Sequence, residues 1–166
     1  MPLNWKGVLV AAFIPVVIRL IWYHPRVLGR VWMNAAGVTQ EKPTRARTLW
    51  VGGLTLVFGV LMAAALLPMV IHQIHVFSSM QGDPAYGKEG AKVTLWLQSF
   101  MSEHGDKFRT FKHGALHGAI AGLFFAAPMV ATNALLERRG WKYILISAGY
   151  WTVTLTLMGA VLCGWK

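Results

Sequence analysis

The chain has 166 residues, of which 55% are hydrophobic and only 13% are charged, and its mean hydropathy is +0.48. Because soluble domains average roughly 25% charged residues, this composition excludes an ordinary water-soluble globular protein. The 16 Lys and Arg exceed the six Asp and Glu, which gives a formal net charge of +10. We expect this charge to lie in loops that face anionic lipid. No nucleic-acid recognition motif accompanies it, so nucleic acid is not an expected partner.

Four apolar segments are long enough to cross a bilayer. A hydrocarbon core needs about 20 apolar residues in a helix, and blocks this long are helices because barrel strands alternate over about ten residues. The segments are 7–23, 49–71, 113–136 and 143–163. Aromatic residues typical of the membrane interface lie at their ends: Trp5, Trp22, Tyr23, Trp50, Trp141, Tyr143 and Trp165. The sequence therefore predicts a single all-α domain, an up-and-down four-helix transmembrane bundle.

The first segment resembles a signal peptide only superficially. Arg19 and the sequence Trp22–Arg26 stand where a cleavage site with small residues would be required. We therefore expect this segment to remain in the protein as a membrane span.

Basic residues in the loops favour one orientation by a narrow margin. The connections after the first and third spans hold eight of them: Arg26, Arg30, Lys42, Arg45, Arg47, Arg138, Arg139 and Lys142. The opposite side holds seven: Lys6, Lys88, Lys92, Lys107, Arg109, Lys112 and Lys166. Since basic loops stay in the cytoplasm, we expect both termini outside, in a multi-pass protein of the bacterial inner membrane.

The long loop 72–112 contains an amphipathic segment. Its apolar residues fall on one helical face: Val93, Trp96, Leu97, Phe100 and Met101. This pattern predicts an interfacial helix at about 91–103. A weaker stripe follows the first span: Val27, Leu28, Val31 and Ala35.

Small residues recur every fourth position in the last two spans. The third span carries Gly114, Gly118, Gly122 and Ala126, and the fourth carries Ala148, Thr152, Thr156, Ala160 and Gly164. Such residues let membrane helices approach closely, so we expect the two spans to pack together. The alternative is that one ridge faces another subunit. Three prolines, Pro15, Pro68 and Pro128, are each able to kink a span.

One full charge, Arg19, lies well inside an apolar segment. Its side chain either extends to the nearby interface or pairs with a buried acceptor. The antiparallel third span brings Asn133 and Glu137 to the same membrane side. We therefore predict a contact from Arg19 to Glu137, with Asn133 as a second acceptor.

Four histidines are expected at one membrane face. His72 and His75 end the second span, and His113 and His117 begin the third. Imidazole binds zinc, copper and iron, including haem iron, so a metal or haem site is one interpretation. The alternative is that these histidines are ordinary polar residues of the membrane interface and bind no cofactor, because the Cys or carboxylate pattern of a recognised zinc motif is missing.

No motif of a hydrolase, metalloprotease or phosphate-binding loop occurs in the sequence. Glu103, His104 and Asp106 are interpreted as a solvated turn. The single cysteine, Cys163, excludes an intrachain disulfide and is interpreted as a packing residue. No catalytic residue is therefore predicted.

Several short sequences together resemble the bacterial family known as domain of unknown function 1761 (DUF1761). They are Asn4-Trp5, Trp22-Tyr23-His24-Pro25, residues 28–33 (LGRVWM), 113–118 (HGALHG), 131–137 (ATNALLE), 146–150 (ISAGY) and 158–160 (MGA). The resemblance implies a small four-helix integral membrane protein. It implies no particular activity, because none is established for the family. Residues 76–112 resemble the family least.

Three functions fit these observations. The first is a non-enzymatic membrane protein that self-associates or serves as an accessory subunit of a membrane complex. The second is a transporter or channel for ions or small solutes, formed by an oligomer. The third is a protein that binds a metal or haem through its histidines.

Overall fold

A computed structural model describes residues 4–38 and 43–166, and in these ranges it is all-helical without any strand, as the sequence predicts. The helices are α1 (Trp5–Trp22), α2 (Gly29–Ala36), α3 (Arg45–Val70), α4 (Gln73–Met80), α5 (Lys92–His104), α6 (Phe111–Ala121), the π-helical turn η1 (Gly122–Ala126), α7 (Ala127–Leu136) and α8 (Trp141–Gly164). Lys42, counted above among the basic loop residues, lies outside the described ranges.

Within the described ranges, four helices are long and apolar enough to cross a membrane: α1, α3, the continuous run α6–η1–α7, and α8. Their bounds differ from the expected spans by four residues at most, at Arg45. Helix α5 coincides with the expected interfacial helix to within one residue at each end, and α2 contains part of the weaker stripe.

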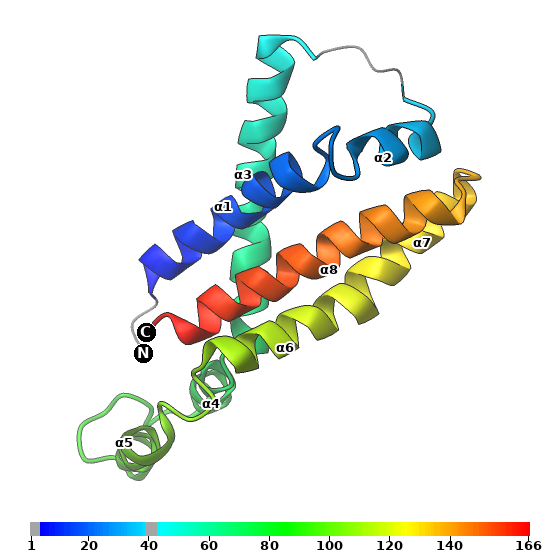
Figure 1. Cartoon of the computed structure of the whole chain (residues 1–166). Helices are drawn as coiled ribbons and strands as arrows, with labels where there is room; N and C mark the ends of the chain where they lie inside the picture. The colour runs from blue at the N-terminus through cyan, green and yellow to red at the C-terminus, as the bar shows by residue number, and fades with distance from the viewer. Residues whose placement is uncertain (1–3, 39–42) are drawn as a thin grey trace.

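Helix α8 lies in the middle of the bundle, with α1 on one side and α6–η1–α7 on the other (Figure 1). Helix α3 crosses them steeply and touches α1 and α8 with its second half. The crossing depends on Gly59, because a Cβ there would meet the carbonyl oxygen of Ala12. The core joins these helices through Val8, Ala11, Ala63, Leu66, Val70, Ala121, Met158, Leu162 and Cys163.

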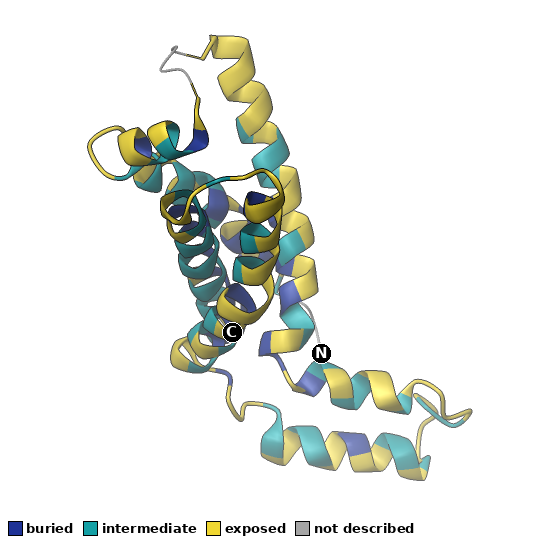
Figure 2. Cartoon of the chain, turned by 90° about the vertical axis from the view of Figure 1, so that its right-hand side faces the viewer, coloured by how far each residue is buried: buried dark blue, intermediate teal, exposed yellow. Residues whose placement is uncertain are grey.

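The first half of α3 extends beyond the other helices and is almost wholly exposed (Figure 2). Leu49 is 71% exposed and Trp50 is 68% exposed. In a bilayer such side chains lie against lipid or another protein.

The π-helical turn accommodates Pro128. Proline lacks an N–H, and its ring clashes with the carbonyl one turn earlier in a regular α-helix. Here the helix widens over Gly122–Ala126, where the N–H of Ala127 bonds to the carbonyl of Gly122, and α7 then starts with Pro128 in its first turn. The other two prolines lie inside α1 and in the last turn of α3.

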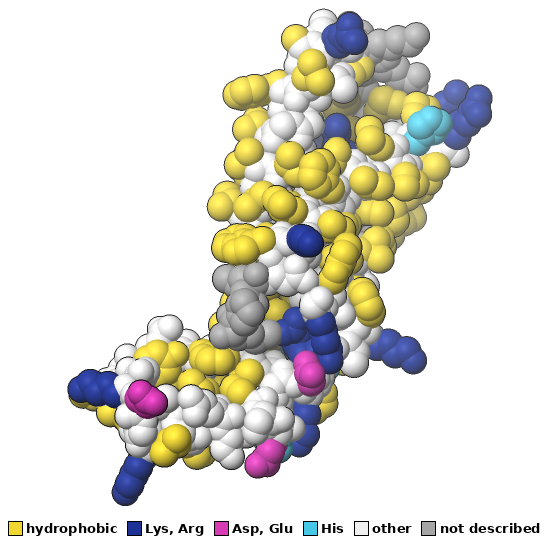
Figure 3. All heavy atoms as spheres, turned by 90° about the vertical axis from the view of Figure 1, so that its left-hand side faces the viewer, with side chains coloured by type: hydrophobic (Ala, Val, Ile, Leu, Met, Phe, Trp, Pro, Cys, Tyr) yellow, Lys and Arg dark blue, Asp and Glu magenta, His cyan; other side chains and the backbone are white. Residues whose placement is uncertain are grey.

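Both termini lie at the same end of the bundle, where α4 and α5 project as an arm (Figures 1 and 2). The side-chain amide of Asn4 donates to the carbonyl of Trp165 at 3.1 Å. On the face shown in Figure 3, hydrophobic side chains cover the length of the bundle, and the acidic side chains gather at the arm end. This distribution fits a bundle with two polar ends.

Candidate metal centre

Three histidines from two segments meet at the arm end of the bundle. The possible ligand nitrogens of His72, His113 and His117 all lie within 4.8 Å of one another. Ring centroids are 4.9 Å apart for His72 and His113, 5.0 Å for His72 and His117, and 4.5 Å for His113 and His117. No other His, Cys, Asp or Glu cluster of this kind occurs in the described part of the chain.

Two of the ligands are placed by the start of α6. The hydroxyl of Thr110 accepts a hydrogen bond from the N–H of His113 at 3.1 Å and caps the helix. Residues four apart in a helix share a face, so His113 and His117 point the same way.

The third ligand comes from the break between α3 and α4. Helix α3 ends at Val70, Ile71 adopts an extended backbone, and His72 follows as the N-cap of α4. This change of direction turns His72 toward the face of α6 that carries the other two rings.

The loop before α6 closes the site on one side. The ring of Phe108 stacks on His113 with centroids 5.0 Å apart and lies 6.1 Å from His72. Phe108 has a positive φ of 63°, which is unfavourable for a bulky residue and is found mostly where surrounding contacts enforce it. Sequence periodicity could not indicate Phe108, because this residue lies in a loop.

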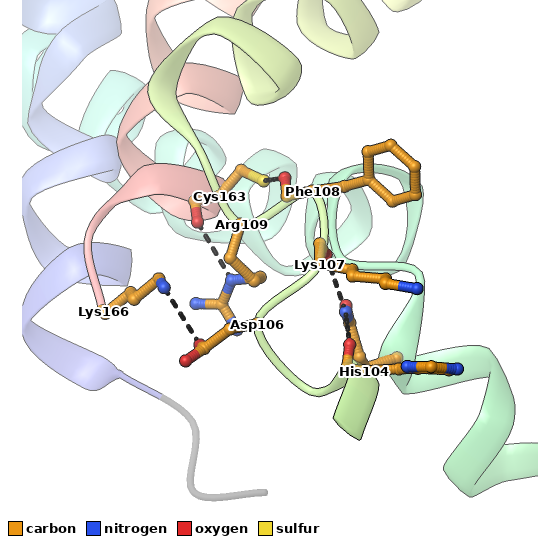
Figure 4. A network of polar contacts seen from close by, with 8 residues as sticks. His104, Asp106, Lys107, Phe108, Arg109, Cys163 and Lys166 are labelled. Atoms are coloured by element: carbon orange, nitrogen blue, oxygen red, sulfur yellow. Dashed lines mark hydrogen bonds and ion pairs between the residues drawn. The ribbon is translucent and has the colours of Figure 1, made fainter. Parts of the chain in front are cut away.

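A network of hydrogen bonds holds that loop in place (Figure 4). The buried amide of Gln73 donates to the carbonyls of His104 at 3.2 Å and Lys107 at 2.8 Å. Arg109, which is 7% exposed, donates through Nε to the carbonyl of Cys163 at 3.0 Å. The thiol of Cys163 lies 3.2 Å from the Phe108 carbonyl and 3.1 Å from that of Val70. The network thus ties the loop to the ends of α3 and α8.

The donor set suits a borderline transition metal such as zinc or copper, since neutral imidazole nitrogens are their common ligands. The Nε2 atom of His113 is buried and makes no hydrogen bond within the described chain. An orphaned imidazole nitrogen beside two others fits a ligand atom. Zn–N bonds of about 2.0–2.1 Å would require the three nitrogens to lie about 3.4 Å from one another, so the rings would have to rotate inward to bind an ion. His72 is exposed, so the site is open to water.

His75 does not belong to the cluster, although the sequence analysis grouped it with the other three. The prediction treated residues 72 and 75 as the end of one continuous span. His72 is the N-cap of α4, whereas His75 lies inside that helix, about 4.5 Å farther along the axis at about 1.5 Å per residue.

The predicted contact of Arg19 with Glu137 and Asn133 does not form in the described structure. Glu137 pairs instead with Arg139 at 3.4 Å. Helix α8 lies between α1 and α7 (Figure 1). The charge of Arg19 is close enough to Tyr150 of α8 to interact with it, and its buried Nε has no hydrogen-bond partner among the described residues. The two spans end on the same side of the bundle, but they are not neighbours.

The small-residue ridge of the third span lies against α8. A Cβ at Gly114, Gly118 or Gly122 would stand closer than 3.0 Å to Gly159, Leu155 or Thr152 respectively. The face of α8 that contacts this ridge includes Thr152, Thr156, Gly159 and Cys163. Two residues predicted for that face lie elsewhere or act otherwise. Ala160 lines a groove toward α1, and the carbonyl of Ala148 accepts a hydrogen bond from the Thr152 hydroxyl. Ala126 lies in another groove, since the extra residue of the π turn rotates the helix face after Gly122.

The remaining candidates have structural partners. Asp106 forms an exposed ion pair with Lys166 at 3.0 Å, and the carbonyl of His104 accepts from Gln73. Glu103 is exposed. Cys163 is fully buried and packs beside Gly114.

Comparison with known proteins gives one match. The model of the family described as "Protein of unknown function (DUF1761)" matches residues 7–163. Neither the curated proteins nor the solved structures compared with the chain give a match.

Proposed function

The chain belongs to the DUF1761 family, a family of unknown function whose model matches residues 7–163. We propose that this membrane protein binds one divalent transition-metal ion through His72, His113 and His117. The convergence of three imidazoles from two separate segments, with their ligand atoms within 4.8 Å, carries the proposal. The buried Nε2 of His113, which has no hydrogen-bond partner among the described residues, supports the proposal.

The site's position suggests how it is used. It lies at the arm end with both termini (Figure 1), and the charge margin of eight against seven favours a position of this end outside the cytoplasm. Three protein ligands leave a further coordination position for water or another ligand. We therefore propose acquisition or sensing of a metal ion at the outer face.

Metal binding to purified protein without a histidine tag tests the proposal. We expect one zinc or copper ion per chain by elemental analysis, and Co²⁺ substitution should give visible d–d bands. His72→Gln, His113→Gln and His117→Gln should each weaken binding at least tenfold. His75→Gln is the matched control and should bind as the wild type does. Absence of stoichiometric metal, or wild-type affinity in all three variants, would overturn the proposal.

A second candidate is a subunit that self-associates or joins a larger membrane complex, and the exposed half of α3 favours it. Gly52 and Gly53 have no atoms within 4 Å of an added Cβ, and Leu49 and Trp50 beside them are exposed. The small-residue ridges of α6 and α8 pack against each other, so association with another subunit would use α3. Crosslinking of cysteines introduced at residues 49 and 53 in native membranes tests this candidate; dimers should form there and not at residue 145 of α8.

A further inference from the structure

A polar cavity of about 220 Å³ lies at the end of the bundle opposite the histidine cluster, among the end of α1, α2, α7 and the start of α8. The lining residues that carry chemistry are Tyr23, Trp32, Asn133, Glu137, Tyr143 and Trp151. The metal site uses none of them.

Aromatic rings form much of the cavity wall. Tyr23 and Trp32 meet edge to face with centroids 5.0 Å apart, and Trp32 and Tyr143 stack at 6.2 Å. The indole N–H of Trp32 donates to the hydroxyl of Ser147 at 3.2 Å, so its ring is held in position by α8. Aromatic ring faces attract cations, and the guanidinium of Arg139 already lies over the face of Tyr143.

A carboxylate and an amide complete the cavity. Glu137 and Asn133 lie one helical turn apart on α7 and both line it. Arg139 already reaches this region, with its Nε 3.4 Å from Glu137 and its guanidinium 5.9 Å from the Tyr143 ring. That ion pair is partly exposed and contributes little by itself. Arg139 also donates to the carbonyl of Ala36, so an amine that replaces it at Glu137 would leave it held on α2.

The residues that line the cavity indicate which class of ligand it binds. One carboxylate without a second acid or a histidine is a poor site for a bare metal ion. A water molecule takes about 30 Å³ of liquid volume, so the cavity has room for a cationic group with several heavy atoms. We propose that the cavity binds the ammonium group of a primary or quaternary amine, against Trp32 and Tyr143 and paired with Glu137.

The amine could be a soluble molecule or the headgroup of a lipid, and two experiments separate these sources. Equilibrium dialysis of the protein in phosphatidylglycerol nanodiscs measures binding of choline and ethanolamine. Native mass spectrometry after mixing with phosphatidylethanolamine measures retention of the lipid. We expect saturable binding of about one amine per chain in at least one of the two.

Glu137→Gln is the decisive variant, because Glu137 is exposed and the change is isosteric. It should weaken amine binding about tenfold or more, as expected for loss of a charged partner, with an unchanged thermal unfolding midpoint. Trp32→Leu should weaken binding about two- to thirtyfold. Glu103→Gln and Trp141→Leu are the controls, since neither residue lines the cavity. No saturable amine binding in either experiment, or equal binding by Glu137→Gln and the wild type, would overturn the proposal.

Discussion

Gly114 of α6 and Gly159 of α8 pack backbone to backbone: a Cβ on either residue would stand closer than 3.0 Å to the other's carbonyl oxygen. The two helices approach closely only because both positions lack a side chain. In lipid, where burial of apolar surface gives no driving force, this close packing is a main source of stability.

Gly114→Ala and Gly159→Ala should therefore each destabilise the bundle by about 1–3 kcal/mol, the usual cost of overpacking. Unfolding in a detergent titration measures the change. Gly52→Ala is the control, because an added Cβ there meets nothing within 4 Å; it should be neutral or slightly stabilising, since alanine favours the helix. Equal effects at all three glycines would contradict the packing described.

Gln73→Leu should loosen the loop that carries Phe108. The substitution leaves the carbonyls of His104 and Lys107 without the donor they have in the wild type. We expect a loss of about 1–3 kcal/mol in stability, faster proteolysis within residues 105–110, and weaker metal binding. Gln98→Leu on the exposed side of α5 is the control and should leave all three measurements unchanged.

Metal binding should weaken on acidification, because protons compete for the imidazole nitrogens that bind the metal. Titration of Co²⁺ or Zn²⁺ at several values between about pH 7.5 and 5 should show a steadily rising dissociation constant. An affinity that does not change over this range would point to ligands other than histidine.

Alkaline stability should depend on Tyr23. Burial, the largest cause, raises the pKa of its hydroxyl from 10.0 to about 12, against an opposing hydrogen bond with Ser147. The folded state therefore favours the neutral phenol more than the unfolded state does. This contribution to stability is complete below pH 10 and is lost as the pH rises toward 12.

Tyr23→Phe removes the ionisable group and provides the comparison. Between pH 10 and 12 the wild type should lose more stability than Tyr23→Phe, as measured by detergent unfolding at each pH. Parallel loss in both proteins would show that ionisation of Tyr23 is not coupled to folding.

The helices and their polar ends follow from the amino-acid sequence alone. Helical spans in lipid must satisfy their backbone hydrogen bonds internally, so length and hydropathy are sufficient to locate them. The spacing of His113 and His117 and the glycine ridge are also local, because four residues return to the same helix face. These features depend on residues that are close along the chain.

Apart from the α6–α8 pair, which the small-residue ridges predict, the neighbours of each helix are known only from the folded arrangement. It placed α8 between α1 and α7, which separates Arg19 from Glu137 and brings Arg19 toward Tyr150. It turned the chain at Ile71, which admits His72 to the histidine cluster and leaves His75 out. The position of α1 and the turn at Ile71 depend on contacts between residues far apart in the chain and on a break between helices, and periodicity within one segment carries no information about these two features.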